Sequence, residues 1–258
     1  MTDGRIHEAA ARGYQSAVER YERGRPSYPD DALSFIVQEL GAAQGRTVVE
    51  LGAGTGKFTE LIAFTGASIV AVEPVPAMRE ALERNCPTVT VLDGTAEAIP
   101  ADEASADAVV VAQAFHWFDG RRALPEIHRV LREGGRLGLI WNVRDEASDW
   151  SEKLTAIFDH LAPPDAPRYK TGAWRTAFEM TDLFGPLRHW VAYHVHRVTR
   201  EAFIDRVMSV SYVASASAED REHVLADVDE LLATDPDLAG KDELVMPYRT
   251  DVYICDRH

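Results

Sequence analysis

Cysteine and long hydrophobic runs are scarce in this sequence of 258 residues, and each shortage excludes a class of protein. The two cysteines, Cys86 and Cys255, form neither a CxxC pair nor the framework of a disulfide-rich secreted domain. No apolar run approaches the roughly 20 residues that span a bilayer. The N-terminus, MTDGRIHEAAARGYQ, lacks the apolar segment of a signal peptide. We therefore expect a cytoplasmic protein with reduced thiols and no membrane partner.

Basic residues are also in deficit, with 27 lysines and arginines against 42 aspartates and glutamates and a formal net charge of −15. Such a balance, without any basic run, disfavours binding to nucleic acid or to an anionic membrane. We therefore expect a small-molecule substrate as the partner, and the sequence leaves the oligomeric state open. The hydrophobic share of 46% is enough for a core of ordinary size.

Short apolar segments alternate with amphipathic ones through the middle of the chain. Continuous apolar strands that alternate with helices predict βαβ units and a parallel sheet covered on both faces, which is a doubly wound, Rossmann-like α/β fold. The strand candidates are Thr47–Leu51, Ser68–Glu73, Val89–Leu92, Ala108–Ala112 and Arg136–Trp141, and the helix candidates are Lys57–Phe64, Pro76–Arg84 and Arg121–Arg132.

The pattern changes after Trp141, where two further strands and three helices are predicted. The strands are Leu187–Val198 and Tyr248–Cys255, and the helices are Trp150–His160, Arg200–Ser209 and Glu219–Ala233. The predicted sheet is therefore seven-stranded and mostly parallel, with an antiparallel last strand and a helical insertion between the last two strands. The predicted divisions are an N-terminal lid and helical segment (1–39), a core (40–198), a helical cap (199–245) and the final core strand (246–258).

A glycine-rich turn follows the first predicted strand, in the stretch VVELGAGTGKFTELI from Val48 to Ile62. A phosphate-binding P-loop would need a hydroxyl residue where Phe58 stands, and its first glycine would fall on Leu51. A dinucleotide fingerprint would need its last glycine one residue after Gly56, which weakens an NAD-binding interpretation without excluding it.

An acidic residue precedes these glycines in the pattern E-x-G-x-G-x-G, which begins at Glu50. A carboxylate there would repel a pyrophosphate but would suit a cationic cofactor with an amine, which glycines allow to approach the backbone closely. Glu73 ends the second strand, 21 residues after Gly52, where a carboxylate can accept hydrogen bonds from ribose hydroxyls. These residues predict a ligand crevice at the carboxyl ends of the strands.

Four motifs, VVELGAGTG, AVEPVPAM, DGTAEAIP and DAVVVAQAFHWF, resemble in order and spacing those of class I S-adenosylmethionine-dependent methyltransferases of the type 11 group. The resemblance covers roughly Arg20 to Asn142 and implies S-adenosyl-L-methionine as the cofactor. It places Glu50 near the amino group of the cofactor and Glu73 at the ribose. The implied cofactor-binding residues are Glu50, Gly52, Ala53, Gly54, Gly56, Glu73, Pro74, Met78, Gly94, Thr95, Ala96, Gln113 and Ala114.

The N-terminal segment YERGRPSYP, from Tyr21 to Pro29, resembles a lid sequence, Y-x-x-x-R-P-x-Y-P, of part of this group. The resemblance makes Tyr21 and Arg25 candidates for binding the methionine carboxylate or an acidic substrate. The alternative is a turn with a solvated arginine, because residues before proline favour extended structure. Arg144 and Arg175 are further candidates for neutralising a substrate carboxylate.

Methyl transfer from a sulfonium is an in-line displacement in which the enzyme mainly orients the reactants, so that no dedicated catalytic residue is required. His116 is a candidate general base for an oxygen or nitrogen nucleophile. The alternative is a histidine packed between Phe115 and Trp117. Ordinary packing is an equally open interpretation for each candidate substrate residue, namely Trp117, Asn142, Trp150, Tyr212 and Tyr248.

The predicted function is methyl transfer to a small-molecule acceptor, such as a carboxylate or a hydroxyl. Gln113-Ala-Phe-His does not resemble the Asn/Asp-Pro-Pro-Tyr motif of enzymes that methylate exocyclic amines of nucleobases. The alternatives are a cofactor-binding protein without turnover and an NAD-binding oxidoreductase. No metal is expected, because His189, His194 and His196 have no cysteine or carboxylate at ligand spacing beside them.

Overall fold

Seven strands form one sheet in the order β3-β2-β1-β4-β5-β7-β6 in the computed structural model, which describes residues 24–146 and 148–258. The four strands β1, β2, β3 and β4 pair in parallel, as does β4 with β5. The strands are β1 (Thr47–Leu51), β2 (Ser68–Val72), β3 (Thr90–Leu92), β4 (Ala106–Ala112), β5 (Leu131–Arg144), β6 (Arg188–Thr199) and β7 (Glu243–Asp256).

The parallel half forms because its strands are apolar on both faces. In β1, Val48, Val49 and Leu51 are all at most 1% exposed, as expected for a strand covered by helices on both sides. Val48 pairs with Ile69 of β2 and with Ala108 of β4, so the carboxyl ends of these strands lie at one edge of the sheet. The predicted doubly wound, mostly parallel sheet is confirmed.

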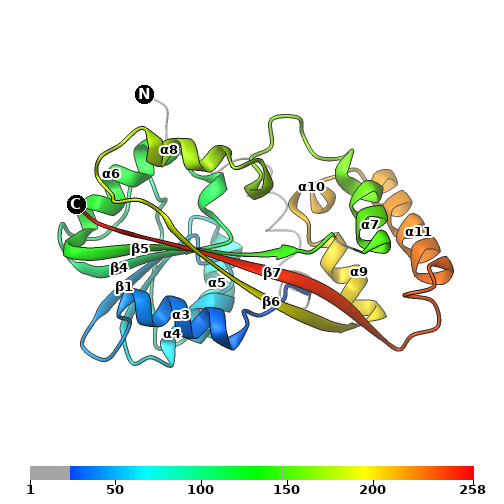
Figure 1. Ribbon diagram of the computed structural model, residues 1–258, viewed down its shortest axis with the longest axis horizontal. Helices are drawn as coiled ribbons and strands as arrows, with labels where there is room; N and C mark the ends of the chain where they lie inside the picture. The colour runs from blue at the N-terminus through cyan, green and yellow to red at the C-terminus, as the bar shows by residue number, and fades with distance from the viewer. Residues whose placement is uncertain (1–23, 147) are drawn as a thin grey trace.

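Helices cover both faces of the sheet, with α3 and α4 on one face and α6 and α8 on the other (Figure 1). Ile36 of α3 and Phe58 of α4 belong to one apolar cluster, whereas Leu124 and Ile127 of α6 belong to the opposite one. The helices are α3 (Asp30–Leu40), α4 (Lys57–Ala63), α5 (Pro76–Asn85), α6 (Gly120–Val130), α7 (Asp149–Asp159), α8 (Thr176–Glu179), α9 (Arg200–Met208), α10 (Ser211–Ala214) and α11 (Ala218–Thr234), with short 3₁₀ turns η1 (Phe115–Trp117), η2 (Tyr169–Thr171) and η3 (Ala173–Arg175).

The last strand, β7, runs antiparallel to both of its neighbours, as predicted. Its pairing with β5 ends where Arg144 faces Tyr248, but its pairing with β6 continues to Thr199 and Glu243. The antiparallel pair β6–β7 therefore extends beyond the rest of the sheet and leads to the helices at its far end (Figure 1).

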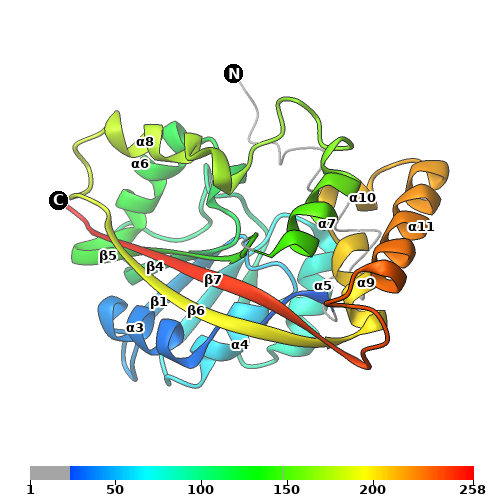
Figure 2. The ribbon, with the colours of Figure 1, turned by 45° about the vertical axis from the view of Figure 1, so that its right-hand side comes forward.

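Four helices pack together at that end as a cap (Figure 2). Three of them, α9, α10 and α11, come from the predicted insertion 199–245, and α7 joins them from the connection between β5 and β6. Leu154 and Phe158 of α7 share an apolar cluster with Phe203 of α9 and Val228 of α11. The cap is thus built from two segments of the chain. Within residues 24–146 and 148–258, no helix is long and apolar enough to cross a membrane.

Phe203→Ala is expected to destabilise the protein by about 3–5 kcal/mol, because the ring is fully buried in the cap cluster and its removal leaves a cavity. The free energy of unfolding in urea measures the effect. Phe64→Ala serves as the matched control, because Phe64 is 91% exposed. Equal stabilities of the two variants would contradict the assignment of Phe203 to a packed core.

Candidate active site

The glycine-rich turn after β1 holds three glycines in left-handed backbone conformations, with φ of 67° at Gly52, 62° at Gly54 and 94° at Gly56. Side chains rarely adopt such angles. A Cβ at Gly52 would also lie 2.8 Å from the Cβ of Ala114, whereas a Cβ at Gly54 would meet no atom within 4 Å. The turn is therefore packed against Ala114 on one side and borders open space at Gly54.

Glu50 is buried at the end of β1, with 1% of its surface exposed. Its Oε2 accepts a hydrogen bond of 2.7 Å from the Thr59 hydroxyl of α4. Burial raises the pKa of Glu50 to about 8, with a smaller contribution from the charge of Glu73. Within the described part of the chain no cationic side chain forms an ion pair with Glu50. The carboxyl group is therefore placed where a cationic ligand would stabilise its charge.

Glu73 lies beside the turn, directly after β2, and is 5% exposed. Its two carboxylate oxygens accept hydrogen bonds of 2.9 Å from the backbone N–H groups of Gly54 and Val75. Burial raises the pKa of this carboxyl group as well. The bond to Gly54 fixes the carboxylate at the open side of the glycine-rich turn.

The segment after β3 completes this edge of the sheet. Ala96 and Met78 are buried, at 4% and 1% exposure. A Cβ at Gly94 would lie 2.5 Å from Pro100, so packing requires glycine there. The Thr95 hydroxyl is buried without a hydrogen-bond partner, which marks it as a polar group that a ligand could satisfy. Pro74 follows Glu73 directly and is partly exposed.

Gln113 directly follows β4 in a left-handed conformation with φ of 62°, which is uncommon for a residue other than glycine. Its N–H donates to the Ile140 carbonyl at 2.8 Å, so the strain is held by the neighbouring strand. Strained residues of this kind concentrate at functional sites. Gln113 lines a cavity of 440 Å³ that extends from this strand end to the cap.

His116 stands in η1 at the wall of the same cavity. The Trp141 indole donates to His116 Nδ1 at 3.2 Å. Burial, together with the charge of Arg25, lowers the pKa of His116 to about 3. The ring is therefore neutral at pH 7, and because Nδ1 accepts a hydrogen bond, its hydrogen is on Nε2. A neutral ring of this tautomer has no free lone pair for a substrate proton, which favours the packing interpretation over the general base.

Comparison with known proteins identifies the family. The family model described as a methyltransferase domain matches residues 49–139. The uncharacterized methyltransferase Rv3342 of Mycobacterium tuberculosis is 44% identical over 244 residues, which cover 95% of this chain and 94% of that protein. The chain belongs to the class I S-adenosylmethionine-dependent methyltransferases.

More distant proteins agree with this family. The methyltransferase also resembles the uncharacterized methyltransferase-like protein C25B8.10 of Schizosaccharomyces pombe, at 35% identity over 95% of each chain. A solved structure described as a type II methyltransferase from Anaeromyxobacter dehalogenans superposes with a TM-score of 0.65, at 22% identity, over 91% of this chain and 97% of that one. This last similarity concerns the fold, which is the mostly parallel sheet described above.

The predicted substrate residues of the methyltransferase lie in three different places. Trp117, Asn142 and Tyr212 line the 440 Å³ cavity. Tyr248 lines a small adjoining void of 30 Å³. Trp150 is 4% exposed and packs against Phe203 in the cap, away from the cavity lining.

Asn142 has both ends of its side-chain amide occupied. Its Nδ2 donates to the Ser27 carbonyl at 3.0 Å, and its Oδ1 accepts from the Thr250 hydroxyl at 2.6 Å. The residue thus ties the N-terminal segment to the sheet. Arg25 of that segment lines the cavity and donates to the Ser209 carbonyl of the cap at 3.5 Å, whereas Tyr21 lies outside the described residues.

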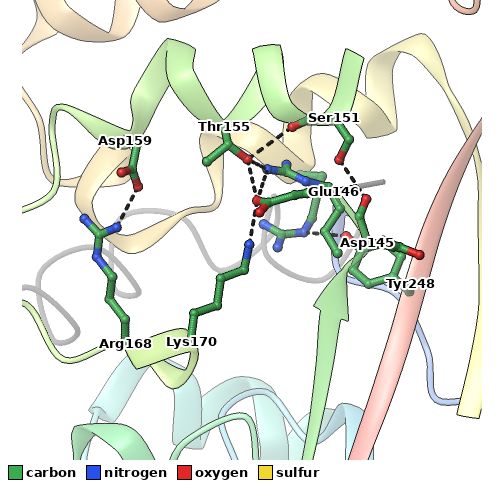
Figure 3. A network of polar contacts seen from close by, with 10 residues as sticks. Asp145, Glu146, Ser151, Thr155, Asp159, Arg168, Lys170 and Tyr248 are labelled. Atoms are coloured by element: carbon green, nitrogen blue, oxygen red, sulfur yellow. Dashed lines mark hydrogen bonds and ion pairs between the residues drawn. The ribbon is translucent and has the colours of Figure 1, made fainter. Parts of the chain in front are cut away.

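Charged residues that the sequence did not single out also line the cavity (Figure 3). Arg144, considered in the sequence for a substrate carboxylate, is among those that line it. Arg175 instead donates to the Tyr253 hydroxyl at 2.6 Å in a neighbouring cavity. No motif points to the others, because helices and loops of different parts of the chain supply them. They are Glu146, Asp159, Arg168, Lys170 and Arg206.

Histidines on β6 share a face without forming a recognisable metal site. His194 lies near Tyr248, with ring centroids 5.7 Å apart, and His196 follows two residues later. Within residues 24–146 and 148–258, no three histidine, cysteine, aspartate or glutamate side chains gather as a metal would require.

Glu50→Gln is expected to change how the stability of the methyltransferase depends on pH. Because the pKa of Glu50 is raised from 4.5 to about 8, its contribution to stability is fully present below pH 4.5 and is lost as the pH rises through about 8. The wild type should lose on the order of 3 kcal/mol relative to the variant between about pH 5 and pH 8.

Urea unfolding of the ligand-free protein at both pH values measures this difference. Glu83→Gln, which changes an exposed glutamate of α5, is the matched control. If Glu50→Gln and the wild type lost stability in parallel, Glu50 would not be protonated in the folded protein.

Proposed function

We propose that this methyltransferase binds S-adenosyl-L-methionine along the carboxyl ends of β1, β2, β3 and β4 and methylates a small molecule in the 440 Å³ cavity. The observation that carries the proposal is the pair of buried carboxyl groups, Glu50 and Glu73, beside a glycine-rich turn that borders open space. When bound, the cofactor supplies a methyl group on a sulfonium, which needs no further activation.

The residues present fit this cofactor. Glu50 would face its ammonium group, and Glu73, held by Gly54 and Val75, would accept hydrogen bonds from the ribose hydroxyls. The buried hydroxyl of Thr95 would form a hydrogen bond with the edge of the adenine. We assign the remaining cofactor contacts to Gly52, Ala53, Gly56, Pro74, Met78, Gly94, Ala96, Gln113 and Ala114 by the motif resemblance.

The acceptor would bind in this cavity, which is lined by Gln113 at one end and by residues of the cap at the other. Trp117 and Tyr212 offer it aromatic walls. Catalysis would then consist mainly of orienting the acceptor and excluding water, which can account for roughly 7–11 kcal/mol of a barrier of this kind. We further propose that the N-terminal segment, of which the structure describes residues 24–39, and the cap 199–245, joined by α7, close over the two ligands. A cytoplasmic location remains a prediction.

The experiment that tests this function measures cofactor binding and methyl transfer separately. Calorimetry with S-adenosylmethionine, S-adenosylhomocysteine and NAD should detect binding of the two sulfur compounds alone. Tritiated S-adenosylmethionine, incubated with a library of small metabolites, should then label at least one of them. Binding of NAD alone would indicate an oxidoreductase, and binding without any labelled product would indicate a protein without turnover.

Glu73→Gln is expected to weaken binding of S-adenosylmethionine by about 1–3 kcal/mol, because an amide can accept only one of the two charged hydrogen bonds from a ribose. Calorimetry measures the dissociation constant, and Glu83→Gln on the exposed side of α5 is the control. An unchanged dissociation constant for Glu73→Gln would place the ribose elsewhere.

His116→Asn is expected to keep methyl transfer within about tenfold of the wild type, because Asn retains an acceptor near Nδ1 for the Trp141 indole. Loss of a general base costs roughly 10²–10⁴-fold. The measurement is kcat as a function of pH, with an acceptor found in the tritium-labelling experiment. A fall of that size together with the loss of a titration step in kcat would restore His116 as the base.

A further inference from the structure

The 440 Å³ cavity contains more positive than negative side chains. The cationic residues that line it are Arg25, Arg144, Arg168, Lys170 and Arg206, and the acidic ones are Glu146 and Asp159. Each of the two carboxylates forms a short ion pair (Figure 3). Asp159 pairs with Arg168 at 2.7 Å, and Glu146 pairs with Lys170 at 2.5 Å. Arg144 therefore shares Glu146 with Lys170, and Arg206 forms no ion pair with a carboxylate of the described lining.

Arg144 is held deep in this wall, with 12% of its side chain exposed. One of its terminal nitrogens donates to the Thr155 hydroxyl and lies 3.7 Å from Glu146, which Lys170 already binds. Its Nε is buried without a hydrogen-bond partner. A buried guanidinium with an unsatisfied donor costs free energy unless an acceptor reaches it.

Arg206 brings a second guanidinium to the same place from α9. Its Nε donates to the neutral Tyr248 hydroxyl at 3.2 Å. No ion pair joins it to a carboxylate within residues 24–146 and 148–258. The pKa of Arg144 is lowered, mainly by its burial and secondly by the positive charge of Arg206, which lies close enough to repel it. Mutual repulsion of this kind is relieved by an anion between the two groups.

We propose that the acceptor is a small organic anion whose oxyanion group, a carboxylate or a phosphate, binds to Arg144 and Arg206 beneath the cap. This inference rests on the function proposed above and names the class of its substrate. Guanidinium groups bind such oxyanions through paired, charge-assisted hydrogen bonds. The rest of the acceptor would contact Trp117, Phe158 and Tyr212, which favours an apolar or aromatic body.

The test compares acids with their uncharged counterparts. Hexanoate, cinnamate, 4-hydroxybenzoate and glutarate are each supplied beside the corresponding primary amide, with phenyl phosphate as the phosphate probe. Binding to the protein saturated with S-adenosylhomocysteine is measured by calorimetry, and methyl transfer by tritium from S-adenosylmethionine. At least one anion should bind or react 100-fold better than its amide or, for phenyl phosphate, than phenol. The better probe distinguishes a carboxylate site from a phosphate site.

Arginine variants test the residues themselves. Arg206→Gln and Arg144→Gln should each weaken binding of the preferred anion by 10–100-fold, raise KM more than they lower kcat, and reduce the preference over the neutral counterpart. Arg200→Gln is the matched control, because Arg200 lies on the same helix and forms an exposed ion pair with Asp229. All three variants should bind S-adenosylmethionine as the wild type does.

The outcomes separate this inference from the proposed function. If the protein bound no S-adenosylmethionine, the function would fail first. If it bound the cofactor but took the neutral probes as well as the anions, or took no anion at all, the anionic acceptor would be wrong. An undiminished preference in both arginine variants would place the anion site at other residues.

Discussion

The burial of two carboxyl groups at neighbouring strand ends is the constraint on which the rest of the site depends. Glu50 and Glu73 can be kept there only because Thr59 and the backbone N–H groups of Gly54 and Val75 bind them. The left-handed glycines bring the N–H of Gly54 to Glu73, and the parallel pairing of β1 with β2 brings the two strand ends together. Residues with a side chain rarely adopt these left-handed angles, so a turn without glycine would not hold the N–H of residue 54 toward Glu73.

The opposite charge gathers at the other end of the same site. Arg144 ends β5 and Arg206 lies on α9, so their proximity depends on the antiparallel pair β6–β7, which extends past the sheet and supports the cap. The glycine-rich edge therefore holds two buried carboxyl groups with raised pKa values, whose negative charge a bound cation would stabilise, whereas the cap cavity holds an excess of positive side chains. A cationic cofactor and an anionic acceptor would each be stabilised at its own end, and their opposite charges would favour binding of the two together.

The sequence predicts the parallel core well because local signals determine it. The bounds of β1 are as predicted, since an apolar run stops at the glycine-rich turn. In contrast, β5 and β7 are longer than predicted, because their ends, such as Arg144 and Glu243, are polar residues that tertiary pairing holds in the sheet. The proposed cofactor edge follows from motifs in one stretch of chain. The charged cavity does not, because Arg206 and Lys170 come to line one cavity only through tertiary packing, which leaves no periodic signal in the sequence.

The position of the arginines also explains how a strongly acidic protein could take an anionic substrate. A net charge of −15 would repel an extended polyanion along its whole length, which is why the sequence disfavours nucleic acid as a partner. A small anion is affected mainly by charges within a Debye length of about 8 Å at physiological ionic strength. Inside the cavity the cationic side chains outnumber the acidic ones and the dielectric constant is lower than in water, so the attraction of Arg144 and Arg206 for the proposed anion would outweigh the distant surface charge. The acidic surface and the basic cavity would thus select together for small anions over large ones.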